Sequence, residues 1–355
     1  MIAPDSLHIA VVGYGYWGSK HVRVLSSKPE VAVTVVETNE LLLAEARATY
    51  PSVHGATSLV QVLSEVDAVV VATPPASHAA IALEALRAGK HVLVEKPLAT
   101  SSHEAELLIR TAATNHVHLM VGHTFEYNAA VWKLKQLIDS GELGDVHYLH
   151  TARLGLGRYQ SDCNVIWDLA PHDISIISYL LDETPHTVGV WAQRYIGQDH
   201  ADVAYLRMDF SETNTQAFVH VSWLDPRRVR QVTVVGERKM AVYDDTSDER
   251  IRVYDVGVDV FPANRLNGPH AMPVSYRTGD IVSPYIPFTE PLSVQAGHFI
   301  ECIRTGSRPN TPGERGLDVV RVLEATDRAD GHHAVVGSPR QAGVHVAGLG
   351  GEVAV

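Results

Sequence analysis

An apolar strand that leads directly into a glycine-rich turn is the feature that most limits how this chain can fold. Residues 7–12 (LHIAVV) precede Gly13, Gly15 and Gly18, which have the spacing G-x-G-x-x-G, and a helical pattern begins at Trp17. The first glycine permits a tight turn, the second lets the backbone approach a pyrophosphate, and the third allows close packing of helix on strand. The free N–H groups that begin the helix favour a negative charge. The sequence therefore predicts a dinucleotide-binding unit.

Short apolar runs alternate with helical patterns through the first third of the chain. The strand candidates are residues 9–12, 31–37, 68–72, 91–95 and 117–121. The helix candidates between them are residues 17–27, 40–49, 76–88 and 102–113. Strands that alternate with helices indicate an α/β domain with a doubly wound parallel sheet. We expect this domain to cover residues 1–124.

The pattern changes after about residue 122. A helix candidate at 128–140 is followed by β-branched and aromatic runs at 146–152, 187–195, 203–210, 215–224 and 229–235. Turns join these runs, so they predict a mostly antiparallel sheet. With helix candidates at 293–305 and 312–328, they indicate an α+β domain over residues 125–330. We expect residues 261–291 to form an ordered loop or lid, and residues 331–355 to be a frayed tail.

Charge and cysteine content argue against several classes of function. The chain has 29 Lys and Arg against 41 Asp and Glu, a net charge of −12, whereas nucleic-acid binding needs a basic surface. Cys163 and Cys302 are the two cysteines and form no C-x-x-C, which favours a reducing cytosol. No stretch approaches the ~20 apolar residues that span a bilayer. We expect a cytoplasmic protein without nucleic-acid or membrane partners.

An acidic residue ends the second strand candidate. Glu37 follows Gly18 at close to the ~20-residue spacing of a ribose-binding carboxylate. Such a carboxylate accepts hydrogen bonds from the ribose and repels a 2′-phosphate, so NAD is favoured over NADP as cofactor. The alternative is that Glu37 is a solvated strand end. The remaining candidates for the cofactor site are Tyr14, Tyr16, Trp17, Thr73, Pro74, His78, Glu95 and Lys96.

A lysine ends the strand candidate at residues 91–95. Ligands of open α/β sheets bind outside the carboxyl ends of the strands, so the ammonium of Lys96 would point at the group that reacts with the cofactor. Pro97 follows and restricts the backbone of Lys96 to an extended conformation. This restriction fixes the direction of the lysine side chain.

Asp168 and His172 form a second candidate for the reacting groups. Pro171 is tolerated best in the first turn of a helix, which places Asp168 near the helix cap and His172 about one turn later. Residues at i and i+4 can share a helix face, and a histidine beside a carboxylate is a typical proton acceptor. One alternative is a capping aspartate with a merely packed histidine. Another is a metal site, but no further ligand has metal-like spacing, so we expect no metal.

Together these motifs resemble the Gfo/Idh/MocA family of NAD(P)-dependent sugar and polyol oxidoreductases. The motifs are Gly13–Gly18, Ala72–Pro75, Glu95-Lys96-Pro97 and the Asp168…His172 pair, in order within residues 7–328. The resemblance implies an N-terminal Rossmann domain and a C-terminal domain with a large, mostly antiparallel sheet. It also implies that Lys96, Asp168 and His172 face the nicotinamide.

Residues 13–18, 160–168, 290–292 and 298–303 are similar to a sugar-nucleotide branch of this family. That likeness implies oxidation of the C3 hydroxyl of UDP-N-acetylglucosamine or a related sugar, giving a keto sugar for transamination in an amino-sugar or aminoglycoside pathway. The chain departs from commoner patterns at residues 125–127 (FEY), where many relatives carry a basic residue. A free inositol or polyol dehydrogenase and a non-catalytic NAD-binding regulatory protein are the alternatives.

In this interpretation each reacting residue has a role. His172 takes the hydroxyl proton, Lys96 stabilises the developing alkoxide, and Asp168 orients and charge-balances His172. The candidates that hold the sugar are Arg158, Gln160, Asn164 and Trp167.

The expected C-terminal sheet has one face without helices. We expect Val219, Val221 and Trp223 to be exposed on it and to form an interface, because exposed apolar patches mark such sites. Relatives pair through this sheet, so a homodimer or homotetramer is expected.

Overall fold

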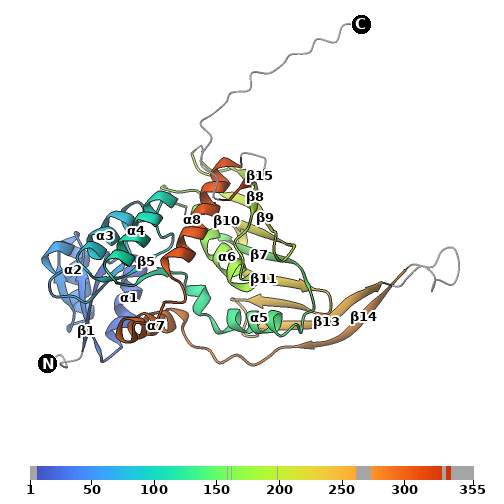
Figure 1. The fold of residues 1–355 in the computed structure, drawn as a ribbon, viewed down its shortest axis with the longest axis horizontal. Coiled ribbons are helices and arrows are strands. Elements are labelled where there is room, and N and C mark those ends of the chain that lie inside the picture. The colour runs from blue at the N-terminus through green and yellow to red at the C-terminus, as the bar shows by residue number, and fades with distance from the viewer. Residues whose placement is uncertain are drawn as a thin grey trace, which may run out of the picture.

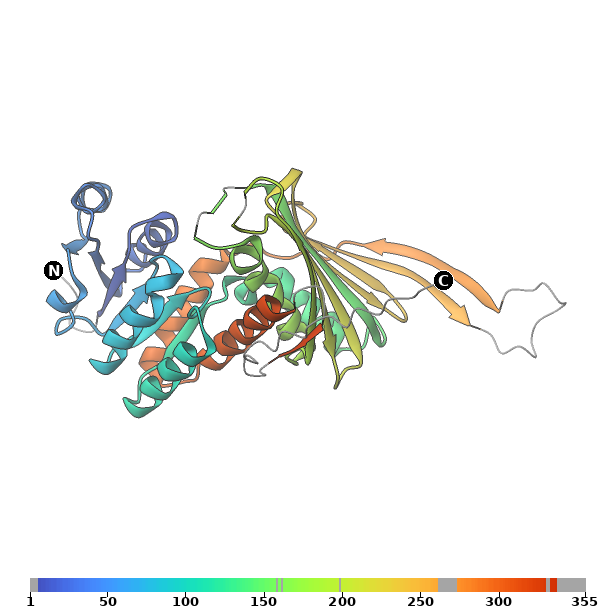
Figure 2. The same ribbon diagram turned by 90° about the horizontal axis from the view of Figure 1, so that it is seen from above.

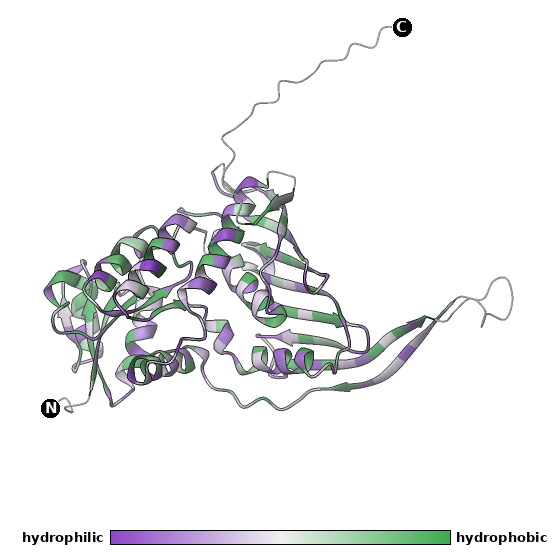
Figure 3. Cartoon of the chain, in the orientation of Figure 1, coloured by the Kyte–Doolittle hydropathy of each residue, from purple (hydrophilic) through white to green (hydrophobic). Residues whose placement is uncertain are grey.

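Two sheets, one parallel and one mostly antiparallel, are joined through a layer of helices (Figure 1). The structure is a computed structural model, which describes residues 6–157, 159–160, 162–197, 199–260, 273–329 and 333–336. Figure 3 shows apolar residues recurring along the strands of both sheets, where the core lies. Among the described residues no helix is long and apolar enough to cross a membrane.

The N-terminal sheet has six parallel strands in the order β3-β2-β1-β4-β5-β6. The strands are β1 (Leu7–Val12), β2 (Val31–Val36), β3 (His54–Ala56), β4 (Ala68–Val71), β5 (His91–Glu95) and β6 (Leu119–Gly122). The connecting helices are α1 (Tyr16–Ser26), α2 (Glu40–Thr49), η1 (Leu59–Gln61), α3 (Pro75–Arg87) and α4 (Ser102–Thr114). Strand order reverses between β1 and β4, and ligands of such sheets bind at that switch point. The predicted doubly wound parallel sheet is confirmed, although the short β3 and η1 were not foreseen.

The C-terminal sheet has nine strands in the order β14-β13-β12-β11-β7-β10-β9-β8-β15. The strands are β7 (Val146–Leu156), β8 (Thr187–Gln193), β9 (Val203–Phe210), β10 (Thr215–Ser222), β11 (Leu224–Gly236), β12 (Met240–Asp244), β13 (Ile251–Val260), β14 (Val274–Val282) and β15 (His333–Val335). Among the described strands of this sheet, only β7 and β10 pair in parallel. The prediction of a large, mostly antiparallel sheet is confirmed.

Helices cover one face of this sheet and leave the other bare (Figure 2). The covering helices are α5 (Ala129–Asp139), α6 (Val165–Leu181) and α8 (Gly313–Arg328), with the short η2 (Thr124–Tyr127) before α5. The remaining helix, α7 (Pro291–Thr305), instead packs on the N-terminal sheet beside α1. A segment late in the chain therefore returns to complete the first core.

The prediction of which residues lie on the bare face is wrong, because it chose the set of β10 side chains that faces the core. Val219 and Val221 are 0% exposed and Trp223 is 2% exposed, because they face α6 in the core. Since side chains alternate along a strand, the bare face carries the other set. Its exposed aromatic residues are Tyr148, Trp191, Tyr205 and Phe218.

Two segments after residue 260 form strands that the sequence did not predict. Residues 274–282, predicted as part of a loop or lid, form β14, which pairs with β13 in an arm that projects from the sheet (Figure 1). Residues 333–335, predicted as the start of a frayed tail, pair with β8 as β15. Residues 261–272 and 337–355 lie outside the described residues.

The corrected side-chain orientation in β10 can be tested with one conservative substitution. Val219→Thr keeps the volume but buries a hydroxyl in the apolar core, so we expect the free energy of unfolding to fall by about 1–3 kcal/mol. The same substitution at Val258, which is 49% exposed on the arm, should change it by less than about 0.5 kcal/mol. Urea unfolding measures both, and equal effects would contradict the orientation of β10.

Candidate active site

The glycine turn between β1 and α1 leaves space where a dinucleotide would place its pyrophosphate. Gly13 has φ of +89°, and a Cβ on Gly18 would lie 1.9 Å from the Gly13 carbonyl oxygen. These two glycines are required by the turn itself. A Cβ on Gly15, in contrast, would meet nothing within 4 Å. Gly15 is also the N-cap of α1 and offers no side-chain cap, so the first N–H groups of the helix remain available to an anion.

Glu37 is held at the edge of this turn. Its carboxylate accepts hydrogen bonds from the backbone N–H of Tyr14 at 2.8 Å and of Asn39 at 2.9 Å. Because two backbone groups fix its orientation, Glu37 is not a freely solvated strand end. The residues present therefore fit NAD: an open turn for the pyrophosphate and a fixed carboxylate beside it for the ribose.

His78 bridges the ends of β4 and β5. Its ring nitrogens lie 2.8 Å from the carbonyl oxygens of Thr73 and of Pro97, and the side chain is buried. Neither ring nitrogen is left for the cofactor. His78 thus holds the two strand ends that would line the nicotinamide rather than lining it itself.

Lys96 reaches from the end of β5 across to α6. Its Nζ donates to the backbone carbonyl of Asp168 at 2.7 Å and lies 3.7 Å from the Asp168 carboxylate. Glu95, just before it, is buried and lies 2.7 Å from Nε2 of His21. Burial opposes ionisation of Glu95, but the hydrogen bond and charge of His21 outweigh it and lower the pKa of the carboxyl. The negative charge of Glu95 therefore lies next to Lys96 in the chain.

Helix α6 begins earlier than Pro171 suggested. Asn164 is its N-cap and accepts from the N–H groups of Ile166 and Trp167, each at 3.0 Å. Pro171 consequently lies inside the helix rather than in its first turn as predicted, whereas Asp168 lies in the first turn, near the cap, as predicted. A proline in this position removes one helical N–H and disturbs the carbonyls one turn before it. The carbonyl that loses its helical partner is that of Trp167, which directly precedes the Asp168 carbonyl that receives Lys96.

The expected contact between Asp168 and His172 is not formed. The Asp168 carboxylate instead accepts from Nε1 of Trp223 at 3.0 Å, in addition to its pairing with Lys96. His172 packs edge-on against Phe125, with ring centroids 5.2 Å apart. Its Nδ1 is enclosed and has no hydrogen-bond partner among the described residues.

Burial, the charge of Lys96 and the charge of Arg153 hold the pKa of His172 well below its usual value. The histidine is therefore neutral near neutral pH. A neutral imidazole has one nitrogen able to accept a proton. What the structure brings together is thus an ammonium and an uncharged base, with the aspartate aligned on the ammonium.

Two supports of this site were missed from the sequence. Arg153 on β7 forms a buried two-point ion pair with Asp173, at 2.8 and 3.2 Å, and its guanidinium lies over the Phe125 ring. Trp223 follows β10 and fixes Asp168. One sign of the ion pair was present in the sequence, because Asp173 directly follows the candidate residue His172. The partners Arg153 and Trp223 are distant in sequence and carry no local signal.

The candidates for holding a sugar that the structure describes lie in the loop before α6 and in the first turn of this helix. The side-chain oxygen of Asn164 is used as the helix cap, and the indole N–H of Trp167 lies 3.2 Å from both carboxylate oxygens of Asp327 on α8. Gln160 is partly buried in the loop before α6, whereas Arg158 lies outside the described residues. Among the described residues no group of three or more His, Cys, Asp or Glu could hold a metal ion.

The different surroundings of Gly15 and Gly18 predict different effects of an added methyl group. Gly15→Ala should leave the thermal unfolding temperature of the free protein nearly unchanged, since its Cβ meets nothing, but should weaken NAD binding by tenfold or more. Gly18→Ala should lower the unfolding temperature by several degrees because the turn must shift. Calorimetry and NAD titration measure both. An unchanged NAD affinity in Gly15→Ala would contradict the cofactor position.

Comparison with known proteins finds family matches to two consecutive stretches of the chain. Residues 7–123 match the NAD-binding Rossmann fold of the Gfo/Idh/MocA oxidoreductase family, and residues 131–242 match a Gfo/Idh/MocA C-terminal domain. UDP-N-acetylglucosamine 3-dehydrogenase of Acidithiobacillus ferrooxidans is 30% identical over 72% of this chain and 79% of its own length. The 4-carboxy-2-hydroxymuconate-6-semialdehyde dehydrogenase of a Sphingobium strain is 28% identical over 89% and 96%.

A solved structure supports the fold over nearly the whole chain. GenD2 from gentamicin A biosynthesis, solved in complex with NAD, superposes with a TM-score of 0.78, covers 94% of this chain and 97% of its own, and is 24% identical. At that identity the likeness concerns the fold alone. Two family domains in order, a relative at 30% identity and the glycine turn with its fixed carboxylate lead to one conclusion: the chain belongs to the Gfo/Idh/MocA family of NAD-binding oxidoreductases.

Proposed function

We propose that this oxidoreductase oxidises a secondary hydroxyl, at C3 of a pyranose, in a sugar nucleotide or in an amino-sugar or aminoglycoside precursor. NAD is the acceptor, and the product is a keto sugar suited to transamination. The observation that carries the proposal is Lys96, whose Nζ is held at the carboxyl edge of the sheet 2.7 Å from the Asp168 carbonyl, beside the uncharged His172. The likeness to a UDP-N-acetylglucosamine 3-dehydrogenase supports the choice of substrate class.

The residues divide the work of moving one proton and one hydride. Bound NAD supplies the hydride acceptor. Lys96 donates a hydrogen bond to the hydroxyl oxygen and stabilises its negative charge as it develops. His172 accepts the hydroxyl proton, which it can do because it is neutral. Asp168, fixed by Trp223, aligns Lys96 rather than His172, which revises the role expected from the sequence.

Substitution of Lys96 tests the chemistry. Lys96→Met should keep the fold and NAD affinity but lower turnover by a factor on the order of 10² or more, because an electrostatic group is lost. Lys90→Met, at the opposite end of β5, is the matched control and should retain turnover. Steady-state NADH formation from NAD, with a sugar that the wild-type protein oxidises, measures both. Near-wild-type turnover of Lys96→Met would contradict the proposed site.

The product tests the substrate assignment. A panel of sugar nucleotides, aminoglycoside-type glycosides and free inositols is incubated with NAD, and NMR locates the carbonyl. A ketone at C3 of a linked pyranose is the expected result. A carbonyl at C4 or C6, or activity restricted to free inositols, would exclude the C3 assignment. NAD binding without turnover on any substrate would favour the non-catalytic regulatory alternative.

We also propose that the chain forms a homodimer or homotetramer through the bare face of the C-terminal sheet. The exposed aromatic set on this face includes the ring pairs Tyr148–Phe218 and Trp191–Tyr205, with centroids 6.3 and 5.7 Å apart. The Tyr205 ring is also stacked on His220 at 3.9 Å. A contiguous exposed patch of this kind is typical of an interface.

The oligomer predicts a specific effect of a charge on this face. Phe218→Glu would bury an unpaired carboxylate in the interface, so light scattering at micromolar concentration should show a shift toward the monomer. Leu41→Glu, at an 82% exposed position on α2, should leave the assembly unchanged. A wild-type protein that is already monomeric would exclude the proposal.

A further inference from the structure

Three titratable side chains close to the active site have buried polar atoms without a partner. These atoms are Nδ1 of His172, both ring nitrogens of His123 and Oε1 of Glu126, and none is hydrogen-bonded among the described residues. Buried polar atoms in proteins are bonded to protein groups or to ordered water. Because no described residue meets these four atoms, ordered water is the partner that remains.

The backbone brings these three residues close together. Glu95 pairs with Gly122 in the β5–β6 register, so Lys96 and His123 are the next residues on neighbouring strand ends. From His123 the chain turns through η2, in which the Glu126 N–H donates to the His123 carbonyl at 2.9 Å. Phe125, between them, contacts the His172 ring. His123 therefore follows the strand end next to that of Lys96, and Glu126 lies one short turn farther along the chain.

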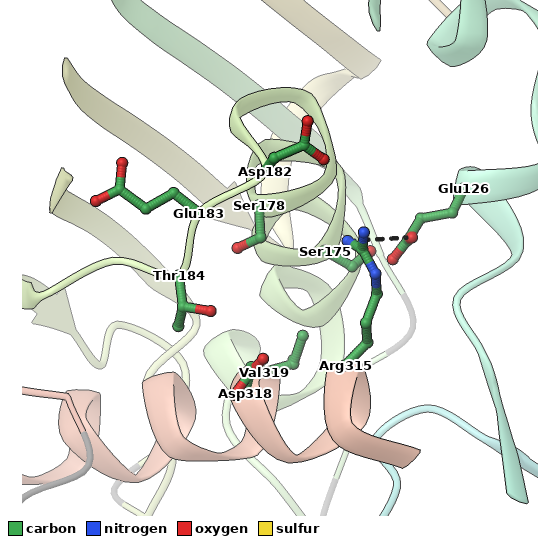
Figure 4. A pocket seen from close by; sticks show the side chains of 9 residues that line it. All are labelled: Glu126, Ser175, Ser178, Asp182, Glu183, Thr184, Arg315, Asp318 and Val319. Carbon is green, nitrogen blue, oxygen red and sulfur yellow. Dashed lines mark ion pairs between the residues drawn. The ribbon is translucent and has the colours of Figure 1, made fainter. Parts of the chain in front are cut away.

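Glu126 ends this series at a cavity of about 230 Å³ that opens to solvent (Figure 4). Arg315 of α8 points at Glu126 across the cavity, 3.6 Å from its Oε2. Ser175 and Ser178 of α6 line the same cavity. The hydroxyl of Ser175 donates to the His172 carbonyl at 3.0 Å, so the cavity lies one helical turn from the active-site histidine.

Alcohol oxidation creates a need for such a connection. The C–H hydrogen leaves as hydride to the cofactor, and the O–H hydrogen must leave as a proton. His172 cannot keep that proton near neutral pH, since burial and the charges of Lys96 and Arg153 disfavour its protonated form. The proton must therefore be passed on within the same step.

Glu126 has the properties of a final acceptor. Burial raises the pKa of its carboxyl to about 8, against the opposing charge of Arg315. A group with a pKa near the working pH can both take up and release a proton. Burial and then Arg315 lower the pKa of His123 to about 3, with Lys96 acting in the same direction and Glu95 against it. His123 therefore passes a proton only by gaining one and losing the other together.

We propose that His123, Glu126 and ordered water carry the substrate proton from His172 to the cavity at Arg315, an inference that rests on the function proposed above. The hydroxyl O–H bond breaks as Nε2 of His172 takes the proton, and Nδ1 releases the one that it held. His123 accepts that proton at one ring nitrogen and gives up another from the opposite nitrogen. The Glu126 carboxyl, which is mostly protonated near neutral pH, takes this proton on one oxygen as it releases the proton that it held to water in the cavity, so charge and protons balance.

Chemical rescue tests the path with a readout that a merely structural role would not change. The first-turnover rate of NADH formation is measured by stopped flow with increasing imidazole in the buffer. Glu126→Gln and His123→Gln should slow this step about tenfold, and imidazole should restore several-fold of the loss by entering the cavity. Wild type and Ser178→Ala, which changes the same cavity without a titratable group, should not respond. Two variants are used because one of the buried positions could impair folding.

A crystal structure separates this proposal from the proposed function. Ordered waters that join Nδ1 of His172 to His123 and Glu126 are expected, and a dry gap would overturn the path whatever the substrate. If waters are present and no sugar is oxidised, the water path is supported and the proposed function fails. If a sugar is oxidised but the variants keep wild-type first-turnover rates without an imidazole effect, the proton path is wrong.

Discussion

The hydrogen bond from Lys96 to the carbonyl of Asp168 is the contact on which the geometry of the site depends. It joins the carboxyl edge of the parallel sheet to a helix that lies on the antiparallel sheet. A buried or half-buried ammonium is costly unless it is paired and hydrogen-bonded, and here one residue supplies both a carbonyl and a carboxylate. The lysine can reach both because it directly follows Glu95, the last residue of β5. A change in the relative position of the two sheets would therefore move the Lys96 ammonium away from Asp168.

Three side-chain contacts fix helix α6, which carries Asp168. Asn164 sets where α6 begins, Trp223 holds the Asp168 carboxylate, and Arg153 binds Asp173. The last pair is buried, so removing one partner would leave an uncompensated charge, which typically costs 3–5 kcal/mol. Helix α7 packs on the N-terminal sheet beside α1 and so completes the core of the domain that carries Lys96. The site is thus built between two elements that are each anchored independently.

The sequence predicts the parts of this arrangement that are local. The glycine spacing, the acidic strand end at Glu37 and the alternation of strands and helices each depend on neighbouring residues, and each predicted its element. The side-chain orientation of β10 was predictable in this way, because Gln216 and His220 are polar and alternate with Val219 and Val221, which places the valines in the core. The expectation that the valines are exposed set this alternation aside and was wrong. The start of α6 was misplaced because Asn164 and Asp168 are both residue types that cap helices. The pairing of Asp168 with Trp223 joins residues far apart in sequence and has no local signature.

The charges around His172 explain why a weak base can serve here. The chain has a net charge of −12, yet Lys96, Arg153 and Arg230 all lower the pKa of this one histidine. A field that disfavours an imidazolium favours an alkoxide at the same place, because the two differ in sign. The cations that weaken His172 as a base thus strengthen the substrate hydroxyl as an acid. In such a field the histidine need not hold a proton at all. In the proposed path it needs only to let one pass, and the unpartnered nitrogens of His172 and His123 would serve that transfer.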